Sequence, residues 1–136
     1  MKHRITLHND TQEIPLLAEF IDGIVEREGI DFSLSLNLNL AMEEAVVNVM
    51  NYAYPEGTVG LIDIDAEIEG DTISFTITDS GTPFDPTKAD DPDITLDAEE
   101  RSIGGLGIHL VRQLMDSEEY RREDGKNIQI IKKKIK

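Results

Sequence analysis

The sequence predicts an α/β two-layer sandwich, with helices packed on one face of a mixed, mainly antiparallel sheet. Three observations predict this fold: the chain opens with a strand and two helices, it contains two antiparallel hairpins, and a long loop and a helix separate those hairpins. The 136 residues can bury one core, and neither a repeat nor a linker divides them. We therefore expect a single domain over residues 1–136.

A change of hydrophobic period marks the first strand and the first helix. Residues 3–8 alternate between apolar and polar side chains, and residues 9–11 (Asn-Asp-Thr) offer a helix N-cap. Apolar residues then recur at helical spacing over residues 14–25. Gly29 suits the position just beyond the end of that helix.

The second helix is less obvious, because residues 33–40 alternate as a strand does. They continue without a turn signal into residues 41–50, which are strongly helical, and the nearest turn signal is at Pro55. We therefore expect one helix over about residues 34–54.

Two hairpins and a third helix make up the second half of the chain. The four expected strands cover residues 59–69, 73–77, 118–122 and 128–135. The expected helix covers residues 106–115. The polar stretch over residues 79–105 contains three prolines and is expected to be a long loop, with one helical turn near residues 96–99.

The chain is strongly acidic, because 28 Asp and Glu residues against 13 Lys and Arg residues give a formal net charge of −15. Such a charge argues against nucleic acid binding, and it opposes binding of free ATP unless a metal ion and backbone donors help. The chain has no cysteine and no apolar run near the roughly 20 residues of a membrane span, and residues 1–4 lead us to expect no signal peptide. We therefore expect a cytoplasmic protein without membrane contact. The lysines at 132–134 are typical of a strand at a sheet edge.

Glu44 and Asn48 are four residues apart in the second expected helix, so they share one face, with Asn51 three residues further on. The amide oxygen of Asn48 can serve as a neutral ligand of Mg²⁺, and the carboxylate of Glu44 can deprotonate a hydroxyl group. A face that merely meets solvent would show the same pattern. Apolar residues on the opposite side should meet the sheet: Met42, Ala45, Val46, Val49 and Ala53.

A second group of candidate residues follows the strand that ends at Asp79. A carboxylate there can accept a hydrogen bond from the exocyclic amine of adenine, and Gly81 lets a base approach the backbone. Pro83 and Phe84 begin a stiff turn with one aromatic ring, which suits the root of a lid over about residues 86–104. An ordinary Asx turn would also explain the start of this segment.

A glycine-rich run opens the third expected helix: Gly104, Gly105, Leu106 and Gly107. Free N–H groups and the helix dipole at such a start favour an anion, and glycines let a phosphate come close. A tight turn into the helix would need the same glycines. No phosphate-binding P-loop motif is present. Arg101 is the nearest cation and is a candidate contact for the γ-phosphate or a partner, although it could equally be an ordinary surface arginine.

These residues together resemble the nucleotide-binding motifs of the GHKL ATPases, the superfamily of gyrase, heat-shock chaperones, histidine kinases and mismatch-repair proteins. The run from Glu44 to Asn48 resembles the N-box. The run that starts at Asp79 (Asp-Ser-Gly-Thr-Pro-Phe-Asp-Pro) resembles the first glycine box, and the run from Gly105 (Gly-Leu-Gly-Ile) resembles the second. The motif forms and the small size are similar to the bacterial anti-sigma-factor serine/threonine kinases of partner-switching systems.

The resemblance implies a kinase that uses ATP and Mg²⁺. It implies that Glu44 is the general base, Asn48 a Mg²⁺ ligand and Asp79 the adenine contact, with Gly105 and Gly107 at the phosphates. It further implies phosphorylation of a serine or threonine on a small antagonist protein, and binding of a sigma factor or similar regulator that excludes the antagonist. Members of this family often form homodimers, and the first strand has the character of a sheet edge.

This chain departs from the family pattern at two places. Tyr52 stands where relatives often have a histidine. Many relatives carry Gly-Thr at the entry to the last strand, whereas this chain has Gly125, Lys126 and Asn127. The second departure puts a hydroxyl contact to the base in doubt and leaves Asn127 as a candidate substitute.

Three other functions remain open at this point. One is a non-catalytic module that holds ATP only to shape a partner-binding surface; phosphate on an antagonist would exclude it. Another is the ATPase domain of a histidine kinase, which needs a phosphoacceptor histidine upstream, where only His3 and His8 lie. The last is an acidic fold without a ligand, which Mg-ATP would not stabilise against heat.

Overall fold

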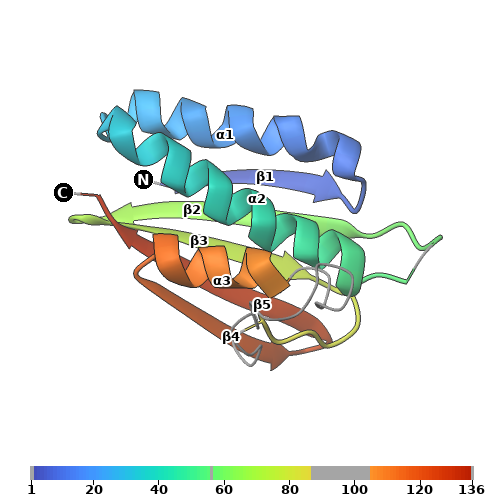
Figure 1. The fold of residues 1–136 in the computed structure, drawn as a ribbon. Coiled ribbons are helices and arrows are strands. Elements are labelled where there is room, and N and C mark those ends of the chain that lie inside the picture. Colours follow the sequence, from blue (N-terminus) through green and yellow to red (C-terminus); the bar gives the residue numbers. More distant parts are fainter. Residues whose placement is uncertain (1, 56, 87–104, 136) are drawn as a thin grey trace.

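The computed structural model describes residues 2–55, 57–86 and 105–135, and the predicted order of elements is confirmed (Figure 1). The strands are β1 (Lys2–His8), β2 (Leu61–Glu69), β3 (Thr72–Asp79), β4 (Ser117–Glu123) and β5 (Lys126–Lys134). The helices are α1 (Ile14–Arg27), α2 (Ser35–Tyr52) and α3 (Gly105–Leu114), and short 3-10 turns at Thr11–Glu13 and Phe32–Leu34 precede α1 and α2. The turn expected near residues 96–99 lies outside the described residues.

The five strands form one sheet in the order β1-β2-β3-β5-β4, and every described pairing is antiparallel. The expected mixed, mainly antiparallel sheet is thus antiparallel in all its described pairs. The three helices lie together on one face of this sheet (Figure 1). No helix among the described residues is long and apolar enough to cross a membrane.

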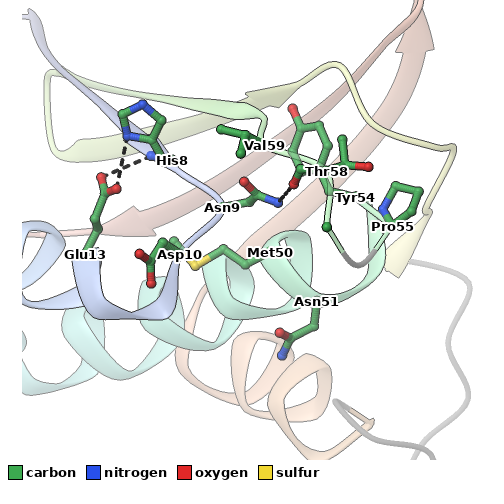
Figure 2. Close-up of a pocket in the computed structure, with 11 residues that line it drawn as sticks. His8, Asn9, Asp10, Glu13, Met50, Asn51, Tyr54, Pro55, Thr58 and Val59 are labelled. Atoms are coloured by element: carbon green, nitrogen blue, oxygen red, sulfur yellow. Dashed lines mark hydrogen bonds and ion pairs between the residues drawn. The ribbon is translucent and has the colours of Figure 1, made fainter.

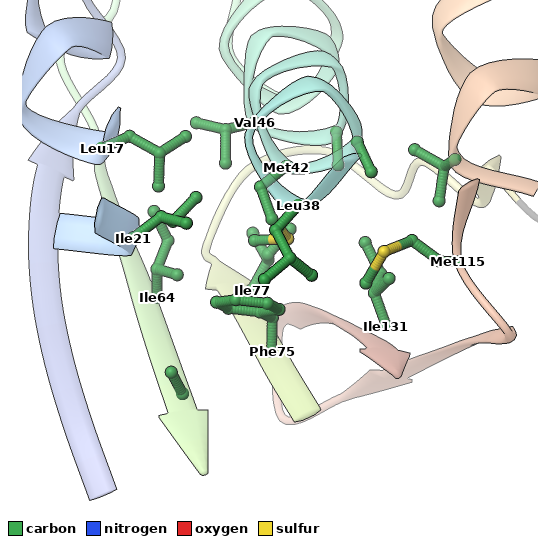
Figure 3. Close-up of a cluster of buried hydrophobic side chains, with 14 of the residues drawn as sticks. Leu17, Ile21, Leu38, Met42, Val46, Ile64, Phe75, Ile77, Met115 and Ile131 are labelled. Atoms are coloured by element: carbon green, nitrogen blue, oxygen red, sulfur yellow. The ribbon is translucent and has the colours of Figure 1, made fainter. Parts of the chain in front are cut away.

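The core lies between α1, α2 and the inward-facing side chains of the sheet (Figure 3). Leu17 and Ile21 of α1 and Met42 of α2 are at most 1% exposed, and they lie over Ile64 and Phe75 of the central strands. The apolar side predicted for α2 is confirmed, because all five of its residues are at most 4% exposed: Met42, Ala45, Val46, Val49 and Ala53. The opposite side of α2 therefore remains available for a site.

The strand-like alternation before residue 41 is part of a helix, as predicted. Of the alternating leucines, Leu38 is fully buried, whereas Leu36 is 65% exposed, so a period of two does not describe which side chains are inside. The carboxylate of Asp31 accepts a hydrogen bond from the backbone of Ser33 and caps the 3-10 turn that leads into α2. The same kind of cap occurs before α1, where the carboxylate of Asp10 accepts a hydrogen bond from the backbone N–H of Gln12 at the start of the 3-10 turn.

The prediction that residues 132–134 guard a sheet edge is wrong. They belong to β5, which pairs with β3 on one side and with β4 on the other, so the edges are β1 and β4. The second hairpin places β4 outside β5, which removes β5 from the edge. Lys133 and Lys134 instead lie 3.7 Å from the carboxylates of Asp116 and Asp71, respectively.

The turn between β4 and β5 sets the register on which the site depends. Asp124 (φ 52°) and Gly125 (φ 74°) are both left-handed, as a two-residue type I′ hairpin turn requires. This turn places Arg122 opposite Asn127 and Tyr120 opposite Gln129. Three side chains of β4 thereby come to the helix-covered face of the sheet: Glu118, Tyr120 and Arg122.

Candidate nucleotide-binding site

Asp79 ends β3 beside β5, where its register partner is Asn127. Its side chain is only 3% exposed, and Oδ1 accepts hydrogen bonds from Gly81 N and Asn127 Nδ2, both at 2.9 Å. Among the described residues no group donates to Oδ2. Burial raises the pKa of Asp79, and the two donors together with the charge of Arg122 oppose that rise. Oδ2 is thus left for a ligand that carries a hydrogen-bond donor.

Asn127 occupies the centre of a hydrogen-bond network. Its Oδ1 accepts from the hydroxyl of Tyr120 at 2.5 Å and from the backbone N–H of Phe84 at 3.3 Å. Its Nδ2 donates to Asp79 Oδ1 at 2.9 Å and to Thr82 O at 2.7 Å. Sequence reasoning named Asn127 but missed Tyr120; the register of a type I′ hairpin would have brought it to the same face.

Gly81 allows the loop after β3 to pack directly on the end of α2. Thr82 N donates to Ala53 O at 2.6 Å, and the Thr82 hydroxyl donates to the same oxygen at 3.1 Å. A Cβ at Gly81 would lie 2.2 Å from that oxygen, which no side chain tolerates. Gly81 is therefore required by packing against α2, independently of any approach by a base.

Replacing Gly81 with alanine should destabilise the protein by about 1–3 kcal/mol, the usual cost of overpacking, because the loop after β3 must move away from Ala53. Urea unfolding measures this change. Gly23→Ala is the matched control, since its Cβ meets only the movable guanidinium of Arg27 at 2.8 Å. Alanine inside a helix is favoured over glycine by roughly 0.5–1 kcal/mol. Equal stability losses in the two variants would contradict the packing argument.

Asn48 lies on α2, is 3% exposed and lines a narrow cavity that is too small in this structure to admit a water molecule. Six further residues line it: Ala45, Phe84, Pro86, Val111, Glu118 and Gln129. Within the described part of the chain, no hydrogen bond reaches the side chain of Asn48. Glu44, one turn earlier on the same helix, is half-buried. The predicted alternative, a face turned wholly to solvent, does not hold for Asn48.

Phe84 brings the two halves of the site together. Its backbone N–H donates to Asn127, next to Asp79, while its ring lines the cavity of Asn48 and stacks on Tyr52 of α2 with ring centroids 5.5 Å apart. Pro83, before it, is exposed. The stiff turn expected at this point therefore connects the end of β3 to the polar side of α2.

Sequence reasoning missed Glu118, which lines the same cavity, and Arg112, which bonds to two of the lining residues. Arg112 Nε lies 3.2 Å from Glu118 Oε1, and a second guanidinium nitrogen donates to Pro86 O at 3.2 Å. Glu118 Oε2 is buried and has no partner among the described residues. Burial raises the pKa of Glu118, and the contact with Arg112 opposes that rise. Arg112 thus joins α3, β4 and the segment before residue 87.

Asn51 does not share the cavity of Asn48. It is exposed and lines a separate pocket of about 560 Å³ between the ends of β1 and α2 (Figure 2). Polar groups in that pocket bond to one another: His8 Nδ1 lies 3.0 Å from Glu13 Oε2, and Asn9 Nδ2 donates to Thr58 O at 2.6 Å. These bonds join β1 to the start of α1 and to the segment before β2. We therefore interpret the polar groups of this pocket as structural.

The glycine-rich run lies partly within the described residues. Gly105, Leu106 and Gly107 form the first turn of α3, as predicted. Arg101 and Gly104, together with residues 87–103 of the predicted lid, lie outside the described residues. Contacts of this helix start with phosphate therefore stay a prediction.

The sequence matches the histidine kinase-like ATPase domain family over residues 7–133. It is 33% identical to the serine-protein kinase RsbW of Staphylococcus aureus, over 88% of this chain and 82% of that protein. It is 29% identical to RsbW of Listeria monocytogenes (93% and 88% covered) and 29% identical to the serine/threonine-protein kinase BtrW of Bordetella bronchiseptica (79% and 76% covered). The solved RsbU and RsbW domains of Rv1364c from Mycobacterium tuberculosis share the fold, with a TM-score of 0.71 and 15% identity over 99% of this chain and 32% of that one.

Proposed function

Since this chain belongs to the histidine kinase-like ATPase family, we propose that it is an ATP-binding anti-sigma regulatory factor that phosphorylates an antagonist protein on serine or threonine in a partner-switching pathway. The relatives named serine-protein kinase, similar over most of their length, support the reaction. The expected place of action is the cytoplasm, where a sigma factor or similar regulator would be the second partner. A homodimer is part of the proposal, and the free edge of β1 supports it.

One observation carries this proposal: the turn at Phe84 joins two residues that are each only 3% exposed, and the described residues donate no hydrogen bond to Asp79 Oδ2 and make none with the Asn48 amide. A ligand that forms hydrogen bonds with such polar groups, as it displaces their remaining contact with water, gains free energy on binding. Adenine would supply an amine to Asp79. The neutral amide oxygen of Asn48 has the donor chemistry that fits Mg²⁺.

In the proposed mechanism the residues of this chain divide three tasks. Asp79 reads the base, and Asn48 with the first turn of α3 holds the phosphate end. Mg²⁺, when bound, neutralises phosphate charge that a chain of net charge −15 would repel. Glu44 accepts the proton of the serine or threonine hydroxyl while the hydroxyl oxygen forms a bond to the γ-phosphorus of ATP. The bond between the γ-phosphorus and the β–γ bridging oxygen breaks, and ADP leaves.

Incubation with Mg²⁺, labelled ATP and small proteins encoded by neighbouring genes should transfer label to one of them as phosphoserine or phosphothreonine. Mass spectrometry of the acceptor identifies the residue, and alanine at that residue is the control.

If no acceptor is labelled, a thermal-shift measurement with Mg-ATP tells whether the chain binds ATP without transferring phosphate or does not bind ATP at all. At about 100 times its Kd, ATP adds roughly 2.7 kcal/mol of stability, which is a rise in Tm on the order of 10 °C for this size. A rise in Tm without transfer to any acceptor would leave the non-catalytic module as the function. An unchanged Tm would exclude nucleotide binding altogether.

A further inference from the structure

Asn127 has no hydrogen-bonding capacity left for a ligand. An amide side chain offers two N–H donors and an oxygen with two lone pairs. In this structure both donors are used, by Asp79 Oδ1 and Thr82 O, and the oxygen accepts from Tyr120 and from Phe84 N. Asn127 is also only 4% exposed. A direct contact to the base, in place of the hydroxyl of related kinases, is therefore excluded while this network is intact.

Asp79 has the opposite character, because one of its oxygens is fully engaged and the other is not. Gly81 N and Asn127 Nδ2 both donate to Oδ1 at 2.9 Å, from the loop and from the neighbouring strand. Because these two donors approach from fixed directions, they fix the orientation of the carboxylate plane. That orientation determines where the second oxygen, Oδ2, points, and the described residues donate no hydrogen bond to it.

The network works in only one orientation of the Asn127 amide. If its oxygen and nitrogen exchanged places, the nitrogen would face the N–H of Phe84, and the oxygen would face Thr82 O and the Asp79 carboxylate. Tyr120, whose hydroxyl donates to Asn127 Oδ1 at 2.5 Å, adds a hydrogen bond that holds the amide in place. The β4–β5 hairpin thus supplies both the amide and a group that holds it.

We propose that Asn127, held in place by Tyr120, is a positioning residue that aims Asp79 and thereby sets the preference for adenine over guanine nucleotides. The inference rests on the proposed function, since it takes Asp79 as the group that meets the base. Adenine carries an amine donor where guanine carries a carbonyl acceptor. A carboxylate oxygen held toward that position binds the amine and repels the carbonyl.

The protonation state of Asp79 also depends on Asn127, and it affects the same preference for adenine over guanine. Burial raises the pKa of Asp79, and the hydrogen bond from Asn127 is the largest influence that lowers it. Without Asn127 the carboxyl would bind a proton more readily, and a protonated carboxyl can donate to the carbonyl of guanine. Loss of Asn127 should therefore weaken ATP binding and relax the discrimination against GTP together.

The test is a comparison of Kd for Mg-ATP and Mg-GTP by calorimetry in the full chain. Asn127→Ala should weaken ATP binding by about 10- to 100-fold, the range that a charge-assisted hydrogen bond covers. GTP affinity should fall less or rise, so the ATP-to-GTP ratio falls by about tenfold or more. Tyr120→Phe, which keeps the ring, should shift the ratio in the same direction by about threefold. Thr78→Ala, one residue from Asp79 on the other face of β3, is the control and should leave the ratio unchanged.

A double-mutant cycle separates positioning from direct contact. If Asn127 acts only through Asp79, then Asn127→Ala should change the ratio little in an Asp79→Asn background. Equal effects in both backgrounds would overturn the inference, as would an unchanged ratio in folded Asn127→Ala. Should that variant fail to fold, an unchanged ratio in Tyr120→Phe would overturn the inference in its place. With phosphorylation as the readout, Asn127→Ala should raise KM for ATP and leave kcat within about twofold. Failure of the wild-type chain to bind ATP would instead refute the proposed function.

Discussion

Replacing Glu44 with glutamine should lower phosphoryl transfer by about 10²–10⁴-fold, the usual contribution of a general base, with ATP affinity nearly unchanged. Glutamine keeps the size and polarity of Glu44 but cannot take up the proton of the acceptor hydroxyl. Glu44 is half-buried one helical turn before Asn48, so the change leaves the cavity of Asn48 and the carboxylate of Asp79 in place. Single-turnover transfer to the antagonist, together with calorimetric binding of ATP, measures the two quantities separately.

Glu43→Gln is the matched control for this experiment. Glu43 precedes Glu44, is exposed and carries the same charge, so both variants change the net charge equally. Transfer should remain near the wild-type rate in Glu43→Gln. Equal rates in wild type and Glu44→Gln would remove Glu44 from the mechanism.

Replacing Asp79 with asparagine should weaken ATP binding by about 100-fold. Gly81 N and Asn127 Nδ2 both donate at the position of Oδ1, so the amide oxygen of the new side chain takes that position. Its NH₂ group then faces the amine of adenine, and two donors oppose each other. Calorimetry with Mg-ATP measures the loss, and binding as tight as in wild type would exclude Asp79 from the base site.

The same substitution should stabilise the protein in the absence of nucleotide. Burial raises the pKa of Asp79 above its ordinary value of 3.8, so the ionised carboxylate is less favourable in the folded state than in the unfolded one. Below pH 3.8 the carboxyl is protonated in both states and costs nothing. As the pH rises from 3.8 through the raised pKa, the unfolded state ionises first and wild type loses stability that Asp79→Asn keeps.

Urea unfolding of both proteins across this pH range should therefore show a difference that grows with pH and then levels off. A difference that is constant over pH would mean that burial does not penalise the charge. Higher stability with lost binding is the trade-off expected of a residue kept for function.

The element order could be predicted because each element carries its own local signal. Hydrophobic period, an N-capping segment and a positive-φ glycine are properties of neighbouring residues, and Asp10 and Gly29 each act in the structure as the sequence indicates. The interpretation of residues 33–40 as helix needed one further argument, the absence of a turn signal before the apolar run.

The contacts that complete the site could not be predicted, because they depend on which strands become neighbours. Tyr120, Arg112 and Glu118 look like ordinary surface residues in the sequence, and only the pairing of β4 with β5 and the packing of α3 bring them to the site. The error at residues 132–134 has the same origin. Glu44, Asn48 and Asp79 were found from motif spacing, and their chemical roles stay predictions.

The hydrogen bond from Thr82 to Ala53 ties the loop after β3 to the end of α2. Asp79 lies shortly before one end of this hydrogen bond and Asn48 shortly before the other, so the spacing between the proposed purine contact and the proposed metal ligand is preorganised. Little ordering entropy is then lost at these two points on binding. A conformational response that tells ATP from ADP would have to start at the third phosphate, with the purine end acting as a stationary anchor.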